Sequence, residues 1–126
     1  MGDAECEEGS VWESFISAAH YKLDNLTVII DRNYMSVDGN TETLMAQLDM
    51  QMKMEAFGWE SVTIDGHDIR QLIEALSYKP EGKPYAIIAK TIKGKGVSFM
   101  ENNKSWHQSV LNECQYHQAV MEIQKG

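Results

Sequence analysis

Short apolar segments rich in β-branched residues recur along the chain, and polar, turn-forming residues bound each of them. They lie at residues 26–30 (LTVII), 59–64 (WESVTI) and 85–90 (YAIIAK). The first and third are nearly continuous apolar runs, which are typical of strands buried on both faces, and the second alternates in a strand-like way. The pattern therefore predicts three strands.

The segments around these strands return to apolar residues every three or four positions, which is the helical period. In the first of them, Val11, Phe15 and Ala18 fall on one helix face. The helices expected from this pattern span residues 8–23, 42–57, 69–77 and about 112–124, with polar loops at 31–41 and 93–105. The DGHD turn at 65–68 is expected to cap the third helix, with His67 as a turn and cap residue rather than a catalyst.

Strands that alternate with helices through short connections predict an α/β fold of three layers, in which helices cover both faces of a parallel sheet. Ligands of such folds bind at the carboxyl edge of the sheet. The loops expected at that edge begin at Asp31, Asp65 and Thr91. The opening Gly2-Asp3-Ala4 fits the same edge, but no strand precedes it, so we expect a fold that is truncated at its N-terminal side.

Composition narrows the range of functions. A chain of 126 residues with 43% hydrophobic residues is expected to form one globular domain. The net charge of −8 argues against binding to nucleic acid or to anionic membranes. No run of about 18 apolar residues and no leader pattern is present, so we expect a cytoplasmic protein. Cys6 and Cys114 lie far apart and form no metal-binding motif, which predicts reduced thiols.

Asp3 and Asn33 are a candidate metal-binding pair, because both fall in loops expected at one edge of the sheet. A carboxylate, an amide oxygen and a backbone carbonyl are ligands that suit Mg²⁺, which commonly completes its coordination with water and substrate phosphates. Asp and Asn in loops are also ordinary turn formers, and that alternative stays open on these residues alone.

A calcium-binding loop is a competing interpretation of residues 31–42, with Asp31 at its first position and Glu42 at its last. Its fifth position holds Met35, and its sixth holds Ser36 where the motif needs a turn-making glycine. A predicted strand also precedes the loop where a helix is required. We therefore reject this interpretation.

The loop Thr91-Ile-Lys93-Gly-Lys-Gly96 combines flexible glycines with two cations and has the residue types of a phosphate-binding segment. It lacks the spacing of a Walker loop, and an ordinary solvated loop is the alternative. His107 follows Trp106 in the next segment, close to this candidate phosphate-binding loop. A lone histidine is usually structural, so His107 becomes a functional candidate only through its neighbourhood.

Taken together, these segments resemble the diphosphate-binding domain of thiamine-diphosphate enzymes, and most closely that of the transketolase family. The family motif is GDG followed by an asparagine some thirty residues later, which here is Gly2-Asp3-Ala4 and Asn33. The phrase NLTVIIDRN at 25–33, the KGKG loop and the SWH element at 105–107 also match transketolases. The resemblance covers nearly the whole chain and implies that residues 1–126 are part of that domain.

The resemblance implies a role for each matching position. Asp3 and Asn33 correspond to side-chain ligands of Mg²⁺ (or Ca²⁺), and Met35 to a backbone carbonyl ligand. The backbone of Ala4 and Glu5 corresponds to residues against the cofactor diphosphate. Ala4 stands where the family usually has glycine, which narrows the space there.

Three further positions correspond to functional residues of the family. Lys93 and His107 match residues that reach the cofactor and the substrate channel, and His107 is the catalytic candidate. Glu8 matches an acidic residue at the interface between subunits.

The implied activity is transfer of a two-carbon ketol unit between sugar phosphates with thiamine diphosphate and Mg²⁺, as in the pentose phosphate pathway. The upstream part of the diphosphate domain and the pyrimidine domain of the family do not match any part of this sequence. We therefore expect a chain that is inactive alone and acts in a homo-oligomer, with a pyrimidine-domain subunit, or with both. The alternatives are a non-catalytic interaction module of the same fold, or a relative of deoxyxylulose-phosphate synthase or of 2-oxo acid dehydrogenase.

Overall fold

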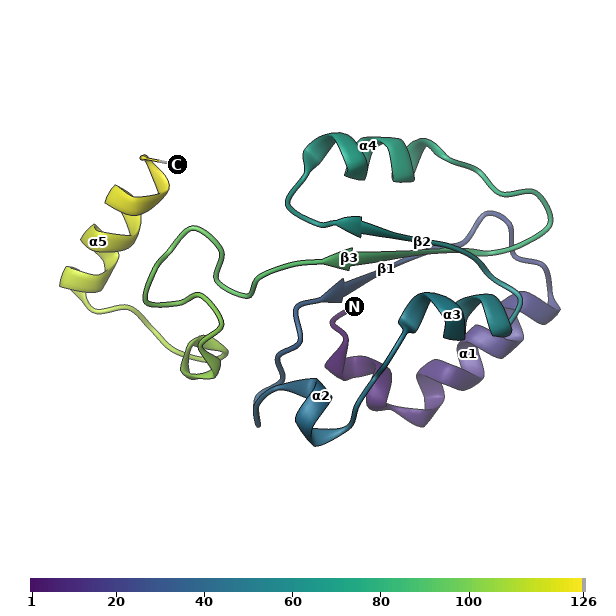
Figure 1. The fold of residues 1–126 in the computed structure, drawn as a ribbon, viewed down its shortest axis with the longest axis horizontal. Helices are drawn as coiled ribbons and strands as arrows, with labels where there is room; N and C mark the ends of the chain where they lie inside the picture. The colour runs from purple at the N-terminus through teal and green to yellow at the C-terminus, as the bar shows by residue number, and fades with distance from the viewer. Residues whose placement is uncertain (126) are drawn as a thin grey trace.

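A three-stranded parallel sheet forms the centre of the molecule in the computed structural model, which describes residues 1–125 (Figure 1). The strands are β1 (Thr27–Arg32), β2 (Glu60–Asp65) and β3 (Tyr85–Lys90), and their spatial order is β1-β3-β2. All pairs are parallel, with Ile87 opposite Ile29 on one side and Val62 on the other. The predicted α/β architecture is confirmed.

Alternate residues of β3 separate the core into two layers. Ala86 and Ile88 face α1 (Gly9–His20) and α3 (Met50–Ala56). Tyr85, Ile87 and Ala89 face α4 (Ile69–Ser77) on the other side of the sheet. The helices therefore lie on both faces, as Figure 1 shows, and β3 is the most deeply buried strand. A fully buried strand explains why its sequence is an almost continuous apolar run.

Our prediction of a single helix over residues 42–57 is wrong. The structure has a short α2 (Thr41–Leu44) and a separate α3, joined by an irregular segment in which Leu48 has φ of +54°. Two polar groups account for the break. The Glu42 carboxylate accepts the Gln47 backbone N–H at 3.0 Å, and Asp49 caps the second helix by accepting the Met52 N–H.

Other elements match their predicted positions with small shifts at the ends. The strand predicted at 26–30 runs on through Arg32, so Asp31 and Arg32 belong to β1 and not to a loop. The predicted burial of this strand on both faces is wrong, because β1 is an edge strand and Thr27, Ile29 and Asp31 are exposed. The helix predicted at 8–23 is α1, preceded by a 3₁₀ turn over Ala4–Glu7. The third helix is confirmed, and Asp68 is its N-cap.

The C-terminal part stands at one end of the molecule (Figure 1). It contains a 3₁₀ turn, Lys104–Trp106, and the helix α5 (Glu113–Ile123). A capping box between Asn112 and Gln115 starts α5, and the hydroxyl of Ser98 in the preceding loop donates to the Glu122 carboxylate at 2.8 Å. The helix is therefore tied to the segment that follows β3.

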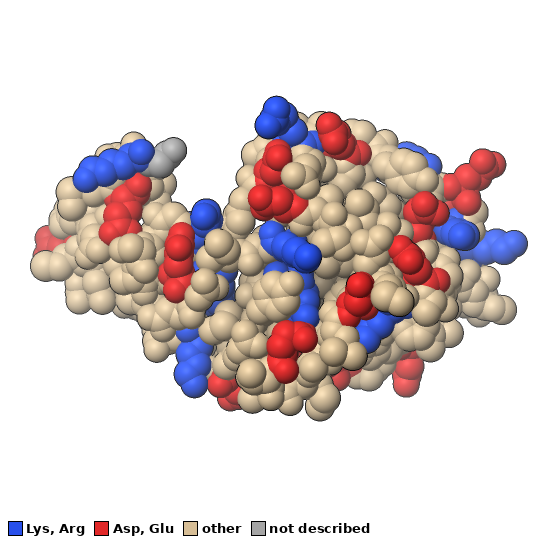
Figure 2. Space-filling view, in the orientation of Figure 1, with Lys and Arg blue, Asp and Glu red and all other residues tan. Residues whose placement is uncertain are grey.

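Acidic and basic side chains are mixed on the face drawn in Figure 2, which shows no large patch of one charge. Among residues 1–125, none of the helices has the length and apolar content needed to cross a membrane.

Candidate functional site

The loops that follow the three strands are held together at the carboxyl edge of the sheet. The Thr91 hydroxyl, after β3, donates to the carboxylate of Asp31 in β1. After β2, the Gly66 N–H donates to the Lys90 carbonyl at 2.8 Å, and a Cβ on Gly66 would come within 2.5 Å of the Thr91 methyl. Only a glycine permits so close an approach of these two loops.

His67 contributes to the same junction. Its Nε2 accepts the backbone N–H of Ile92 at 2.8 Å, while its own backbone N–H donates to Asp65. An imidazole nitrogen that accepts is unprotonated, so the ring proton lies on Nδ1. We expected His67 to be a turn and cap residue. It lies in the turn, but the N-cap is Asp68, and the His67 ring also fixes the start of the loop that contains Lys93.

Residues 1–3 join this edge beside β1. The Asp31 N–H donates to the Met1 carbonyl at 2.8 Å, and the Asp3 N–H donates to the Asp31 carbonyl at 3.0 Å. Gly2 and Asp31 thus form a parallel bridge. This pairing places Asp3 beside residues 32–34, although about thirty positions separate them in sequence.

The Asp3 carboxylate is completely buried, and each of its oxygens accepts at least one hydrogen bond. Its Oδ1 accepts one bond, from the Ala4 N–H at 2.9 Å. Its Oδ2 accepts three, from Arg32 Nη1 at 2.6 Å, the Tyr34 N–H at 2.9 Å and Thr41 Oγ1 at 3.3 Å. One oxygen is therefore saturated, and the other keeps capacity for a further ligand.

Arg32 is a central residue of the site that sequence reasoning missed. Besides Asp3, its guanidinium donates to Thr41 Oγ1 at 3.2 Å and to the Glu42 carboxylate, and its Cζ lies 4.3 Å from the centre of the Tyr34 ring. Burial alone lowers the pKa of Arg32, but hydrogen bonds to Glu42 and Asp3 outweigh it and raise that pKa. The hydrogen bond between Arg32 and Glu42 lowers the pKa of the Glu42 carboxyl. The available signal was a charged residue two positions after the apolar run LTVII.

The loop after β1 places Asn33 and Met35 next to this cluster. Asn33 Oδ1 accepts the Met35 N–H at 2.9 Å, and Tyr34 between them has φ of +61°, a conformation that non-glycine residues rarely adopt. Within residues 1–125 the Met35 carbonyl accepts no hydrogen bond. Backbone strain of this kind concentrates at functional sites.

These donors fit a hard cation. Asp3 Oδ1, Asn33 Oδ1 and the Met35 carbonyl are all oxygens with acceptor capacity left, which is the donor chemistry of Mg²⁺. Residues 1–125 contain no group of three or more His, Cys, Asp or Glu side chains that could hold a metal, so any cation here needs amide or carbonyl oxygens, water or a bound ligand as well.

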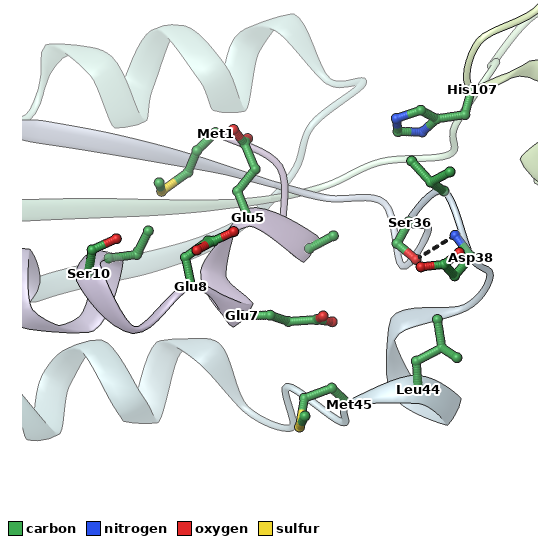
Figure 3. A pocket seen from close by; sticks show the side chains of 13 residues that line it. Met1, Glu5, Glu7, Glu8, Ser10, Ser36, Asp38, Leu44, Met45 and His107 are labelled. Carbon is green, nitrogen blue, oxygen red and sulfur yellow. Dashed lines mark hydrogen bonds between the residues drawn. The ribbon is translucent and has the colours of Figure 1, made fainter.

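A cleft of about 740 Å³ collects most of the other candidates. Its lining includes Ala4, Glu5, Glu8 and His107. Figure 3 shows His107 next to the turn at residues 36–38, with the glutamates of the N-terminal segment on the other side of the opening. The structure thus brings together four predicted site residues from the two ends of the sequence.

Lys93 lies elsewhere, in a second cleft of about 620 Å³ that Asn33 and His67 also line. Gly94 follows with φ of +74°, and a Cβ there would meet the Met100 carbonyl at 2.6 Å. The loop therefore requires glycine at this position. Asn33 links the two parts of the site, because it lies beside the Asp3 cluster and in the cleft of Lys93.

Comparison with known proteins identifies the family. Residues 1–123 match the family model described as transketolase, thiamine diphosphate binding domain. The chain belongs to the transketolase family. The sequence resemblance stated above is therefore confirmed.

Relatives in this family are similar over nearly the whole chain. An apulose-4-phosphate transketolase subunit from Actinobacillus succinogenes is 42% identical over 123 residues, which are 97% of this chain and 45% of the relative. Human transketolase is 41% identical over 124 residues, 98% of this chain and 20% of the human protein. The chain thus spans less than half the length of these relatives.

Solved structures show the same fold. The transketolase of Campylobacter jejuni superposes with a TM-score of 0.90 at 34% identity, over 98% of this chain and 20% of that protein. The roles that the transketolase resemblance implies for Asp3, Asn33, Met35, Lys93, His107 and Glu8 stay predictions.

Proposed function

We propose that this chain forms the diphosphate-binding part of a transketolase-like enzyme, which transfers a two-carbon ketol unit between sugar phosphates. One observation carries the proposal. The buried carboxylate of Asp3 lies beside the Asn33–Met35 loop at the carboxyl edge of the sheet, where α/β folds bind their ligands. The membership of the family supports thiamine diphosphate as the cofactor.

In this proposal Asp3, Asn33 and Met35 hold Mg²⁺ through two side-chain oxygens and one carbonyl. The backbone of Ala4 and Glu5 lies against the diphosphate. When bound, the cation would offset the diphosphate charge and the thiazolium ring would supply the electron sink that ketol transfer needs. The chain itself contributes binding, orientation and charge.

Lys93 and His107 complete the assignment. Lys93 is a cation on a loop whose glycines allow close approach, which suits a phosphate group. His107, in the cleft with Ala4 and Glu5, can donate hydrogen bonds to a phosphate or to sugar hydroxyls. Of the site residues, His107 is our candidate for direct contact with the substrate.

Partner chains are part of the proposal. Two relatives are named as subunits of an apulose-4-phosphate transketolase, which supports an enzyme of more than one polypeptide. We propose that a pyrimidine-domain subunit or a second copy of this chain completes the active site, with Glu8 at the interface. The two free cysteines suit a reducing compartment and support a cytoplasmic location.

Isothermal titration calorimetry with thiamine diphosphate and Mg²⁺ tests the proposal. We expect the chain to bind weakly, to catalyse no ketol transfer alone, and to lose binding in Asp3→Asn. Asp24→Asn is the matched control, because Asp24 is exposed on the loop before β1. Equal binding by both variants would refute the cofactor site. Ketol transfer by the isolated chain would refute the need for a partner.

A further inference from the structure

Arg32 makes contacts that the proposed function does not use. It ends β1, two residues after the apolar run Val28–Ile30, and only 3% of it is exposed. Buried arginines are uncommon unless they are paired, and this one pairs with two carboxylates. Those carboxylates, Asp3 and Glu42, come from segments on opposite sides of Arg32 in the sequence.

The guanidinium divides its donors between these segments. Nη1 donates to Asp3 Oδ2 and to Thr41 Oγ1, and Nη2 donates to Glu42. The Thr41 hydroxyl also donates to Asp3 Oδ2, so arginine, threonine and aspartate form a closed ring of hydrogen bonds. A planar fork with fixed donor directions holds such a ring in one geometry, which a lysine cannot do.

This ring has a consequence for Asp3. Three donors occupy Oδ2, and two of them depend on Arg32 directly or through Thr41. Because Oδ2 is occupied, the carboxylate cannot turn without losing these bonds. Its other oxygen, Oδ1, accepts only the Ala4 N–H, so it has acceptor capacity left.

We propose that Arg32 is a positioning residue, which fixes the Asp3 carboxylate so that Oδ1 faces the divalent cation and ties it to the loop of Asn33 and Met35. The inference rests on the proposed function for the cation itself. It deepens that function because Arg32 is not itself a metal ligand, yet the geometry of the ligand Asp3 depends on it. Mutation of a residue that orients a metal ligand typically weakens metal affinity 10- to 100-fold.

Coulomb repulsion alone predicts the opposite effect. A guanidinium 2.6 Å from Asp3 repels a cation, so its removal should tighten metal binding if charge were all that mattered. Positioning predicts weaker binding after the same change. The sign of the effect therefore separates the two explanations.

Mn²⁺ is the probe, titrated into the chain and followed by electron paramagnetic resonance. Arg32→Gln should weaken Mn²⁺ binding by roughly 10-fold or more. Arg70→Gln is the matched control, because Arg70 carries the same charge on a side chain that is 91% exposed, and it should leave the affinity unchanged. Unchanged or tighter binding by folded Arg32→Gln would overturn the proposal.

A second readout needs no metal. The Tyr34 N–H donates to Asp3 Oδ2, so its hydrogen exchange reports whether the carboxylate is in place. We expect exchange at Tyr34 to accelerate by about 10-fold or more in Arg32→Gln, relative to amides of β3, and not in Arg70→Gln. Unchanged protection at Tyr34 would also overturn the proposal.

Glu42→Gln covers the case in which Arg32→Gln does not fold. The Glu42 side chain is 34% exposed, so its neutralisation leaves no buried charge unpaired while it weakens one anchor of Arg32. Loss of a negative charge weakens cation binding by itself, so for this variant the deciding readout is hydrogen exchange at Tyr34. We expect that exchange to accelerate by about 3-fold, less than in Arg32→Gln, because the other anchor remains. Unchanged exchange at Tyr34 would count against positioning.

Asp3→Asn separates this inference from the proposed function. If the native chain and Asp3→Asn bind Mn²⁺ equally, or neither binds it, the metal site itself fails. Exchange at Tyr34 in the Arg32 variants then still decides whether Arg32 positions the carboxylate.

Discussion

The interior of the sheet and its carboxyl edge are stabilised by different physical means. β3 is held by apolar side chains that alternate between two helical layers, and its neighbours on both sides have the same parallel register. The edge is held by charged and polar groups from segments distant in sequence, with Arg32 between Asp3 and Glu42. The interior therefore sets stability, whereas the edge sets the direction in which functional groups point.

The largest effect is expected in the interior. Ile87→Ala removes a fully buried side chain from the middle strand and should lower the free energy of unfolding by about 4 kcal/mol. Its register partner Ile29 is 39% exposed, so Ile29→Ala should cost about 1 kcal/mol. Urea denaturation of both variants measures the difference. Equal losses would contradict the assignment of the core to β3.

The buried Cys6 and the exposed Cys114 differ in the same way, and Cys6 makes stability depend on pH. Burial, followed by the charge of Asp3, raises the pKa of Cys6 to about 11 from an ordinary value of 9.0, whereas Cys114 is exposed. The folded chain holds the Cys6 proton more tightly than the unfolded chain. The stabilisation is therefore complete below pH 9 and is lost as the pH rises towards 11.

Thiol titration with a coloured disulfide reagent checks this assignment at pH 8. We expect one rapid reaction, at Cys114, and a second only when the chain unfolds. Cys114→Ser should remove the rapid phase, and Cys6→Ser should leave it intact. A fast phase that survives in Cys114→Ser would show that Cys6 is accessible.

A smaller and local effect is expected at the edge. His67→Ala removes the acceptor of the Ile92 N–H and should cost about 1 kcal/mol. Its main result should be faster hydrogen exchange at Ile92, because the loop of Lys93 loses this anchor. His117→Ala is the control, on a side chain that is 67% exposed. Normal protection of Ile92 in His67→Ala would remove His67 from the junction.

The smallest effect is the contribution of Glu42 to acid stability. Its hydrogen bond with Arg32 lowers the pKa of Glu42 below the ordinary value of 4.5. The unfolded chain therefore binds this proton more readily, so the stabilisation is present above pH 4.5 and is lost as the pH falls through the lowered value. Thermal unfolding between pH 7 and pH 3 should show a shallower loss in Glu42→Gln, and an identical slope would contradict the pairing.

The sequence predicted the interior far better than the edge, and the reason is physical. Periodicity reports which faces are buried, so the strand at 85–90 and the helix at 69–77 were predicted with their observed limits. It does not report polar contacts between distant segments. Leu48 continues a helical apolar spacing, yet hydrogen bonds of Glu42 and Asp49 interrupt the helix around it.

The candidate site was predictable only in part. Family motifs pointed to Asp3 and Asn33, and strand order explains why they meet at one edge. Arg32 was missed because we assigned it to a loop, whereas it ends β1 and reaches Asp3 across 29 positions. Such a pairing becomes visible only once the chain has folded.

Paramagnetic line broadening tests the central claim most directly, because it locates the cation without requiring catalysis. Substoichiometric Mn²⁺, added to the ¹⁵N-labelled chain, should first broaden the amide signals of Ala4, Tyr34 and Met35, while the signals of α5 stay sharp. Broadening that centres on exposed carboxylates such as Glu113, or that is uniform along the chain, would contradict the metal site at Asp3.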